Sequence, residues 1–370
     1  MDITVLLLFV LGLVLLLAGA EILLRGATRL AAALGISPLV IGLTVVAFGT
    51  SSPELAVTVQ SAWAGQSDMA LGNVIGSNIC NVLLILGLAA LITPLVVAHK
   101  LIRLDVPLMI GLSLLMLLMG LDGQIGRFDG AILFAGIILY IIWSIRQSRQ
   151  ESRQVKQEYA QEYGPEPVPP SPRNLMMYVA LVAIGLGMLT IGSNWLVEGA
   201  IMMARALGLS ELLIGLTIIA IGTSLPEVAA SVMASLRGER DIAVGNVVGS
   251  NIFNILSVLG LTSLVSPNGI HVPAAALSFD IPVMIAVAAA CLPIFFNGHK
   301  IARWEGGLLF GYYLVYTLYL ILRATEHTIL PAFVAAMVYF IIPLTVITLA
   351  VVLTRTVRTN RQTMAQGQNS

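Results

Sequence analysis

Charge is what this sequence has least of. Charged side chains make up 10% of the 370 residues and hydrophobic ones 58%, whereas a soluble domain carries about 25% charged and about 45–50% apolar residues. So few charges exclude a soluble globular protein, although the length alone would suggest two or three such domains. The composition instead predicts a membrane protein.

Cysteine and histidine are also scarce. The two cysteines, Cys80 and Cys291, lie inside apolar segments, where we expect them to pack as small hydrophobic residues. The four histidines lie near the ends of apolar segments or between them: His99, His271, His299 and His327. The sequence therefore offers no set of histidine and cysteine ligands of the kind that zinc or copper recruits.

Long apolar runs, by contrast, are abundant. A helix needs about 20 mostly apolar residues to cross the membrane, whereas strands of a membrane barrel would alternate in segments of about ten. Only Met1 and Asp2 precede the first run, so we expect a span there and not a cleavable signal peptide. The predicted spans number eleven and cover residues 3–20, 37–64, 70–93, 103–120, 128–145, 174–193, 209–236, 242–266, 276–296, 304–322 and 329–354.

The basic residues predict an orientation, because lysine and arginine favour short loops on the cytoplasmic side. If the N-terminus lies outside, sixteen of the nineteen basic residues fall inside, and only Arg127, Arg205 and Arg323 fall outside. The pattern therefore predicts a multi-pass protein of the plasma (inner) membrane, embedded in the lipid bilayer, with an outside N-terminus and a cytoplasmic C-terminus.

One long polar stretch, residues 146–173, divides the chain. Its early part could continue the fifth helix into water, and its end, Gly-Pro-Glu-Pro-Val-Pro-Pro-Ser-Pro, cannot be helical. The predicted organisation is a five-helix unit over 1–145, a cytoplasmic linker over 146–173, a second five-helix unit over 174–322, and an additional transmembrane helix with a cytoplasmic tail over 323–370.

The two five-helix units repeat one sequence. A shift of 173 residues places IGLTVVAFGTSSPELA (41–56) on IGLTIIAIGTSLPEVA (214–229), and DMALGNVIGSNICNVLLILGL (68–88) on DIAVGNVVGSNIFNILSVLGL (241–261). Because five spans are an odd number, the second unit must enter the membrane in the opposite orientation. We therefore predict an all-α polytopic membrane protein of two inverted-topology repeats plus an extra C-terminal helix, typical of secondary transporters with a midplane substrate site.

The deepest acidic residues, Glu54 and Glu227, occupy equivalent places in the two repeats. Each lies about midway along a predicted span, where an unpartnered carboxylate would cost several kcal/mol. Each also follows a proline, which removes a backbone donor and frees carbonyl oxygens in the preceding turn. The residues that share a helical face with the glutamates are Ala47, Thr50 and Ser51 in the first repeat and Ala220, Thr223 and Ser224 in the second.

The next span of each repeat carries the motif G-N-x-x-G-S-N. Ser77 and Ser250 each stand one helical turn before an asparagine, so these side chains can face the same site as the carboxylates. The asparagines from which we expect supporting polar contacts are Asn73, Asn81, Asn246 and Asn254. Such a site offers only oxygen ligands, which suit hard cations such as calcium. Two carboxylates balance one divalent ion, or several monovalent ions or protons in turn, and this competition is the physical basis of exchange.

The twin motifs G-T-S-x-P-E and G-N-x-x-G-S-N resemble the alpha repeats of the calcium/cation antiporter superfamily, particularly its prokaryotic sodium/calcium exchangers, over residues 1–322. The resemblance implies that the first and sixth helices, here 3–20 and 174–193, slide against the core to give alternating access. It implies no catalytic residue, no cofactor and no nucleic-acid partner, since calcium and sodium are the transported substrates. The calcium ligands that it implies are Glu54, Glu227, Thr50 and Thr223, and the sodium ligands are Ala47, Ser51, Ser77, Ala220, Ser224 and Ser250.

One departure from the family pattern concerns Asn254, where several such exchangers have an aspartate. The amide removes one titratable charge, so proton-coupled calcium exchange stays open as the alternative to sodium coupling. A channel would more usually assemble identical subunits around a pore. An intramembrane enzyme would need a paired acid with a nucleophile, or a metal-binding histidine set, and neither appears in the spans. Asp105 and Asp280, each two residues before a proline, are expected to cap helix N-termini.

Overall fold

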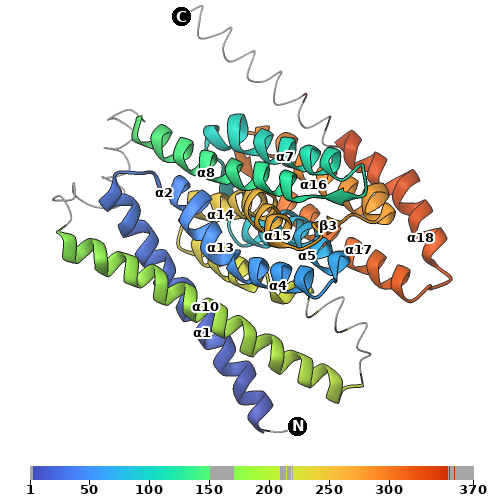
Figure 1. Ribbon diagram of the computed structural model, residues 1–370, viewed down its shortest axis with the longest axis horizontal. Helices are drawn as coiled ribbons and strands as arrows, with labels where there is room; N and C mark the ends of the chain where they lie inside the picture. The colour runs from blue at the N-terminus through green and yellow to red at the C-terminus, as the bar shows by residue number, and fades with distance from the viewer. Residues whose placement is uncertain are drawn as a thin grey trace, which may run out of the picture.

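The computed structural model describes residues 3–150, 171–208, 214, 218, 220–348, 350 and 354, and this part of the chain is almost entirely helical (Figure 1). The elements of the first repeat are α1 (Ile3–Leu34), α2 (Pro38–Ile41), the π-helix η1 (Gly42–Val46), α3 (Ala47–Thr50), α4 (Ser52–Trp63), α5 (Ser67–Cys80), η2 (Asn81–Leu86), α6 (Gly87–Ile92), β1 (Leu95–Val96), η3 (Leu101–Asp105), α7 (Val106–Met119), β2 (Gln124–Ile125) and α8 (Arg127–Gln150).

The second repeat follows the same plan, and a last helical segment comes after it. Its elements are α10 (Pro172–Ala206), α12 (Ala220–Gly222), α13 (Leu225–Leu236), α14 (Arg240–Phe253), η5 (Asn254–Leu259), α15 (Gly260–Val265), β3 (Ile270–His271), η6 (Ala276–Asp280), α16 (Ile281–Phe296), β4 (Lys300–Ile301), α17 (Arg303–Ala324), α18 (Leu330–Ala336) and η7 (Met337–Ile341). The strands form two short antiparallel pairs between the repeats, β1 with β4 and β2 with β3.

The helices confirm the prediction of an all-α polytopic membrane protein. Among the described residues, nine segments are long and apolar enough to span a membrane, and the bent pair Pro38–Thr50 and Ser52–Trp63 would make a tenth. Part of the remaining predicted span, 209–236, falls on residues outside the described ranges. Its described end forms α12 and α13.

Two predicted spans were too short. The sequence predicts 3–20 and 174–193, whereas α1 continues to Leu34 and α10 runs from Pro172 to Ala206. Glu21 and Arg25 interrupt the apolar run of α1 without ending the helix, because they lie four residues apart on one face while Leu23, Leu24 and Ala27 remain buried on another. Arg25 therefore lies on a helix and not in a loop.

The expected capping role of Asp105 and Asp280 is wrong. Both residues have right-handed helical backbone angles, and neither side chain caps the helix that follows, because a π-helical turn leads directly into α7 and into α16. Asp105 is fully buried, and its Oδ1 instead accepts a hydrogen bond of 3.1 Å from the hydroxyl of Tyr140 on α8.

The core of the molecule includes the segment Arg240–Val265, which is buried from Ile242 to Gly260. Its helix α14 packs against α2, η1 and α3 of the first repeat and against α13 of the second. In contrast, α1 and α10 lie together along one side of the body and cross each other (Figure 1). This arrangement places the motif-bearing helices α4, α5, α13 and α14 at the centre (Figure 1).

Glycines bring the backbones of α1 and α10 into direct contact. A Cβ added to Gly12 would lie 2.8 Å from the carbonyl oxygen of Gly192, and one added to Gly19 would lie 3.0 Å from that of Gly185. Residue numbers rise along α1 as they fall along α10, so the two helices are antiparallel. A shift of 173 residues relates Gly12 to Gly185 and Gly19 to Gly192. Antiparallel packing of equivalent helices is the relation that an inverted repeat requires.

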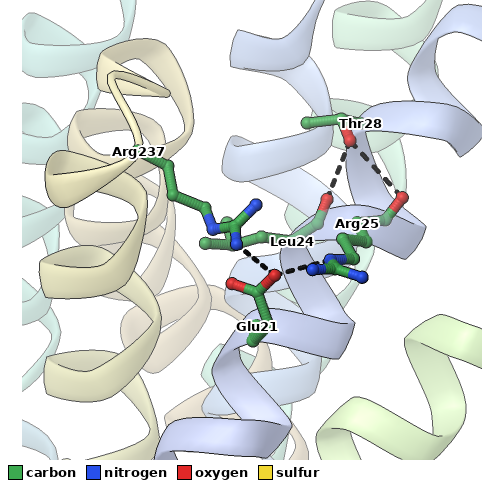
Figure 2. A network of polar contacts seen from close by, with 5 residues as sticks. All are labelled: Glu21, Leu24, Arg25, Thr28 and Arg237. Carbon is green, nitrogen blue, oxygen red and sulfur yellow. Dashed lines mark hydrogen bonds and ion pairs between the residues drawn. The ribbon is translucent and has the colours of Figure 1, made fainter.

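One ion-pair network joins α1 to the core. The carboxylate of Glu21 contacts Arg25 of the same helix, at 2.5 Å, and Arg237 at the end of α13 (Figure 2). The contact between Glu21 and Arg237 joins the two repeats and has no symmetry-related copy, because Asn194 and Ala64 occupy the positions that correspond to Glu21 and Arg237.

Candidate functional site

Each motif glutamate follows a break in its helix. Ser51 has φ −81° and ψ 6°, and Ser224 has φ −89° and ψ 6°, so the helical path is interrupted just before α4 and α13. Pro53 and Pro226 lie in the first turn of these helices and have no N–H to continue the preceding ladder. The axis bends by 43° at the first break, and Glu54 therefore lies in the first turn of α4.

The sequence predicts free carbonyl oxygens in the turn before each motif proline, and the structure matches this expectation only in part. Proline leaves the carbonyl of Gly222 without its helical donor, but the hydroxyl of Ser193 on α10 fills this place at 2.9 Å. In the first repeat, the Ala47 oxygen accepts a backbone bond of 3.0 Å from Ser51. Ala220 opens α12 at the matching place. The ligand role of the Ala47 and Ala220 carbonyls stays a prediction.

The two repeats exchange equivalent hydrogen bonds at the glutamates. Ser51 Oγ donates to Glu227 Oε1 over 3.1 Å, and Ser224 Oγ donates to Glu54 Oε1 over 3.0 Å. All four side chains are buried, with each glutamate 1% exposed. Each carboxylate is therefore held by a residue of the other repeat, as a two-fold relation between the repeats requires.

A second set of reciprocal contacts places the threonines. The hydroxyl of Thr50 lies 3.2 Å from Asn246 Oδ1, and that of Thr223 lies 3.5 Å from Asn73 Oδ1. The amide nitrogens of these two asparagines in turn donate to hydroxyls on α13 and α4, from Asn246 to Ser231 and from Asn73 to Thr58, each over 2.9 Å. Each threonine hydroxyl thus contacts the opposite repeat, and that of Thr50 also lies 3.0 Å from the carbonyl oxygen of Val46 in its own repeat.

The last pair of predicted residues, Asn81 and Asn254, opens the π-helices η2 and η5. Asn81 Nδ2 donates to Asn251 Oδ1 over 3.0 Å, and Asn254 Nδ2 donates to Asn78 Oδ1 over 3.1 Å. π-helical turns occur frequently at functional sites. Ser77 completes the first repeat's side of the site, with its oxygen 3.5 Å from that of Ser224.

Several buried oxygen atoms at this centre have no hydrogen-bond partner within the described part of the chain. They are Glu54 Oε2, Glu227 Oε2, Asn81 Oδ1, Asn254 Oδ1 and Ser250 Oγ. An unsatisfied buried polar atom costs about 1–3 kcal/mol, and more where it is charged. Carboxylate, amide and hydroxyl oxygens are the kinds of ligand that hard cations take. Among the described residues, no three histidine, cysteine, aspartate or glutamate side chains lie close enough together to hold a metal ion by themselves.

Several residues that help to build this centre escaped the sequence-based prediction. Thr58, Ser231, Ser193, Asn78 and Asn251 hold predicted ligands or the backbone around them. Four of them could have been found, because Thr58 aligns with Ser231 and Asn78 with Asn251 under the shift of 173 residues. Ser193 aligns with Ala20, so the repeat gives no signal for it.

Known proteins of similar sequence include ion exchangers. The profile of the family described as "Sodium/calcium exchanger protein" matches residues 4–146 and 177–322. The chain is 37% identical over 311 residues to inner membrane protein YrbG of Escherichia coli, covering 84% of this chain and 94% of the relative. It is 34% identical over 339 residues to sodium/calcium exchanger MaX1 of Methanosarcina acetivorans, covering 84% and 96%.

A solved structure supports the same assignment. The sodium-calcium exchanger NCX_Mj, soaked with zero Na⁺ and Ca²⁺, matches with a TM-score of 0.72 and 30% sequence identity, over 85% of this chain and 98% of that one. These proteins are transporters, so the comparisons confirm that the chain is an antiporter and not an enzyme. The chain belongs to the sodium/calcium exchanger protein family.

Proposed function

We propose that the protein exchanges calcium for sodium across the plasma (inner) membrane, with Glu54 and Glu227 as the principal calcium ligands. The observation that carries this proposal is the set of unpartnered oxygens around the two buried carboxylates. Calcium takes six to eight oxygen ligands. The relatives' names, sodium/calcium exchanger MaX1 and sodium-calcium exchanger NCX_Mj, give the ions.

The proposed ligands divide between the two ions as the family resemblance implies. Thr50 and Thr223 join the glutamates on calcium. The groups proposed for sodium are the hydroxyls of Ser51, Ser77, Ser224 and Ser250 with the carbonyls of Ala47 and Ala220. Because Ser51 and Ser224 also contact the carboxylates at 3.1 and 3.0 Å, the two ions compete for overlapping oxygens and need not be bound together.

Alternating access is proposed to come from α1 and α10 moving against the core. Both helices lie on one side of the body and contact each other through backbone (Figure 1). The orientation that we propose has the N-terminus outside and the C-terminus in the cytoplasm, as the distribution of basic residues predicts. The inner-membrane location agrees with the name of the relative YrbG.

Reconstituted vesicles test the proposal directly. Proteoliposomes loaded with sodium and diluted into sodium-free buffer should take up ⁴⁵Ca²⁺, and collapse of the sodium gradient with an ionophore should stop this uptake. Glu54→Gln and Glu227→Gln should abolish it. Glu198→Gln is the matched control, because Glu198 is an exposed acid on α10. Full uptake in both site variants would overturn the proposal.

The alternative that the sequence favours is coupling to protons, because Asn254 supplies an amide where several exchangers have an aspartate. The same vesicles distinguish the two. Calcium uptake driven by a pH gradient in sodium-free buffer on both sides would assign proton coupling, and dependence on the sodium gradient alone would exclude it.

A further inference from the structure

Two methionine sulfur atoms lie at the outer ends of the asparagine contacts. Asn251 Nδ2 lies 3.3 Å from Sδ of Met109, and Asn78 Nδ2 lies 3.4 Å from Sδ of Met284. Met109 and Met284 occupy equivalent positions of α7 and α16 once the two-residue insertion between the repeats is counted. The protein therefore contains two chains of the same composition, Met109–Asn251–Asn81 and Met284–Asn78–Asn254.

The thioether sulfur determines the orientation of the amide next to it, which is Asn251 in one chain of contacts and Asn78 in the other. A thioether sulfur has no hydrogen and can only accept a hydrogen bond. The NH₂ group of Asn251 must therefore face Met109, which turns its carbonyl oxygen toward Asn81. Asn81 uses its own NH₂ group to bond this oxygen at 3.0 Å. Its Oδ1 is left without a partner among the described residues.

The second chain ends in the same way at the other repeat. Asn254 donates to Asn78 over 3.1 Å, and its Oδ1 also lacks a hydrogen-bond partner within the described ranges. With both amides reversed, each chain would set an oxygen against a sulfur and present NH₂ hydrogens to the site. Such hydrogens would repel a cation, whereas a carbonyl oxygen can coordinate one.

No solvent is available to replace these contacts. The two methionines and four asparagines are each no more than 3% exposed. The space between Met109, Met284, Asn78 and Asn251 has no room for a water molecule. The side-chain contacts therefore set the amide orientation.

We propose that Met109 and Met284 are positioning residues that act through Asn251 and Asn78 to turn the amide oxygens of Asn81 and Asn254 toward the transported cation. The inference rests on the proposed function, since it takes a cation to be bound between the two glutamates. It gives the two methionines a role beyond packing, because their sulfur atoms accept from amides that contact the asparagines of the site.

The test replaces each sulfur with a carbon group of similar volume. Met109→Leu and Met284→Leu remove the acceptor, and swaps of this kind usually cost less than about 1.5 kcal/mol of stability. The purified full-length proteins are titrated with Ca²⁺ while their thermal unfolding is followed in detergent, and the KM and kcat for Ca²⁺ are measured in vesicles. We expect the apparent affinity for Ca²⁺ to fall, and the KM to rise, by roughly two- to ten-fold, which is the effect of losing one hydrogen bond. The kcat should change little.

The control is Met116→Leu, a buried methionine on the same helix as Met109, which should leave both quantities unchanged. A second comparison separates positioning from packing. In an Asn81→Ala background, Met109→Leu should weaken Ca²⁺ affinity no further, because the oxygen that Met109 orients is gone. A further loss in that background would show a packing effect and overturn the positioning role.

The remaining outcomes distinguish this inference from the proposed function. A wild-type protein that shows neither a Ca²⁺-dependent shift in unfolding nor exchange would overturn both. If the wild-type protein binds Ca²⁺ and the two leucine variants match Met116→Leu, the positioning role alone is wrong and the exchange function stands.

Discussion

The hydroxyl of Ser224 donates to the carboxylate of Glu54 over 3.0 Å, so a residue of the second repeat holds the glutamate of the first. A substitution of either serine therefore acts on the glutamate of the other repeat. The reciprocal contact from Ser51 to Glu227 is nearly the same length, at 3.1 Å.

Ser224→Ala should lower kcat/KM for Ca²⁺ by about ten-fold or more, because a hydrogen bond to a charged group contributes roughly 1.5–3 kcal/mol. The measurement is initial ⁴⁵Ca²⁺ uptake at several Ca²⁺ concentrations. Ser52→Ala is the matched control, since Ser52 is exposed and in the described contacts its hydroxyl bonds only the carbonyl of Phe48 on the preceding helix α3. Equal rates in the two variants would show that the Ser224 contact does not support the site.

Gly192→Ala should separate α1 from α10, because the new Cβ would lie 2.7 Å from the backbone nitrogen of Leu16. We expect a loss of about 1–3 kcal/mol of stability together with a large fall in exchange. Gly187→Ala on the same helix is the control, since its Cβ would meet no described atom within 4 Å. Gly192→Ala should unfold at a lower temperature in detergent and take up less ⁴⁵Ca²⁺ in vesicles than Gly187→Ala. Equal results for the two variants would argue against close backbone packing of α1 and α10.

Arg237→Ala should change the rate of exchange more than Arg25→Ala does. Arg25 and Glu21 are both on α1, whereas Arg237 is at the end of α13 (Figure 2). Only the contact between Glu21 and Arg237 can therefore depend on the position of α1 relative to the core. Half-exposed ion pairs contribute up to about 1 kcal/mol, so the change should stay within about five-fold. It should shrink at high ionic strength. Equal effects of the two substitutions would exclude a state-dependent contact.

Tyr140→Phe should destabilise the protein, because it removes the hydroxyl that bonds the fully buried Asp105. The expected loss is about 1–3 kcal/mol, measured by thermal unfolding. Tyr316→Phe is the comparison, since Tyr316 and Asp280 line a cavity of about 400 Å³ and are only partly buried. A larger effect at Tyr316 would contradict this account.

The repeat in the sequence predicted most of the residues that the structure brings together at the two glutamates, because symmetry carries information that a single motif lacks. Because each repeat has five predicted spans, the two copies of the motif enter the membrane in opposite orientations. The reciprocal contacts of Ser51 with Glu227 and of Ser224 with Glu54 are consistent with that relation. The paired asparagines Asn81 and Asn254 were predicted for the same reason.

Other features depend on contacts between distant segments and left no local signal. Met109 aligns with Met284 only after an insertion, and a methionine in an apolar helix is ordinarily a packing residue. The capping prediction for Asp105 failed because the helix starts earlier, in a π-helical turn, so there is no free N-terminus to cap. The length of α1 was missed because polar residues four apart end an apolar run without ending a helix.

The glycine contacts between α1 and α10 bear on how such a protein avoids leakage. Backbones that touch at Gly12 and Gly19 leave little freedom for one helix to shift while the other stays. If the pair moves, it moves as a single rigid body against the core. Under the proposed alternating access, such a displacement would close one side of the membrane as it opens the other, so a continuous aqueous path would not form and no second gate would have to be timed to the first.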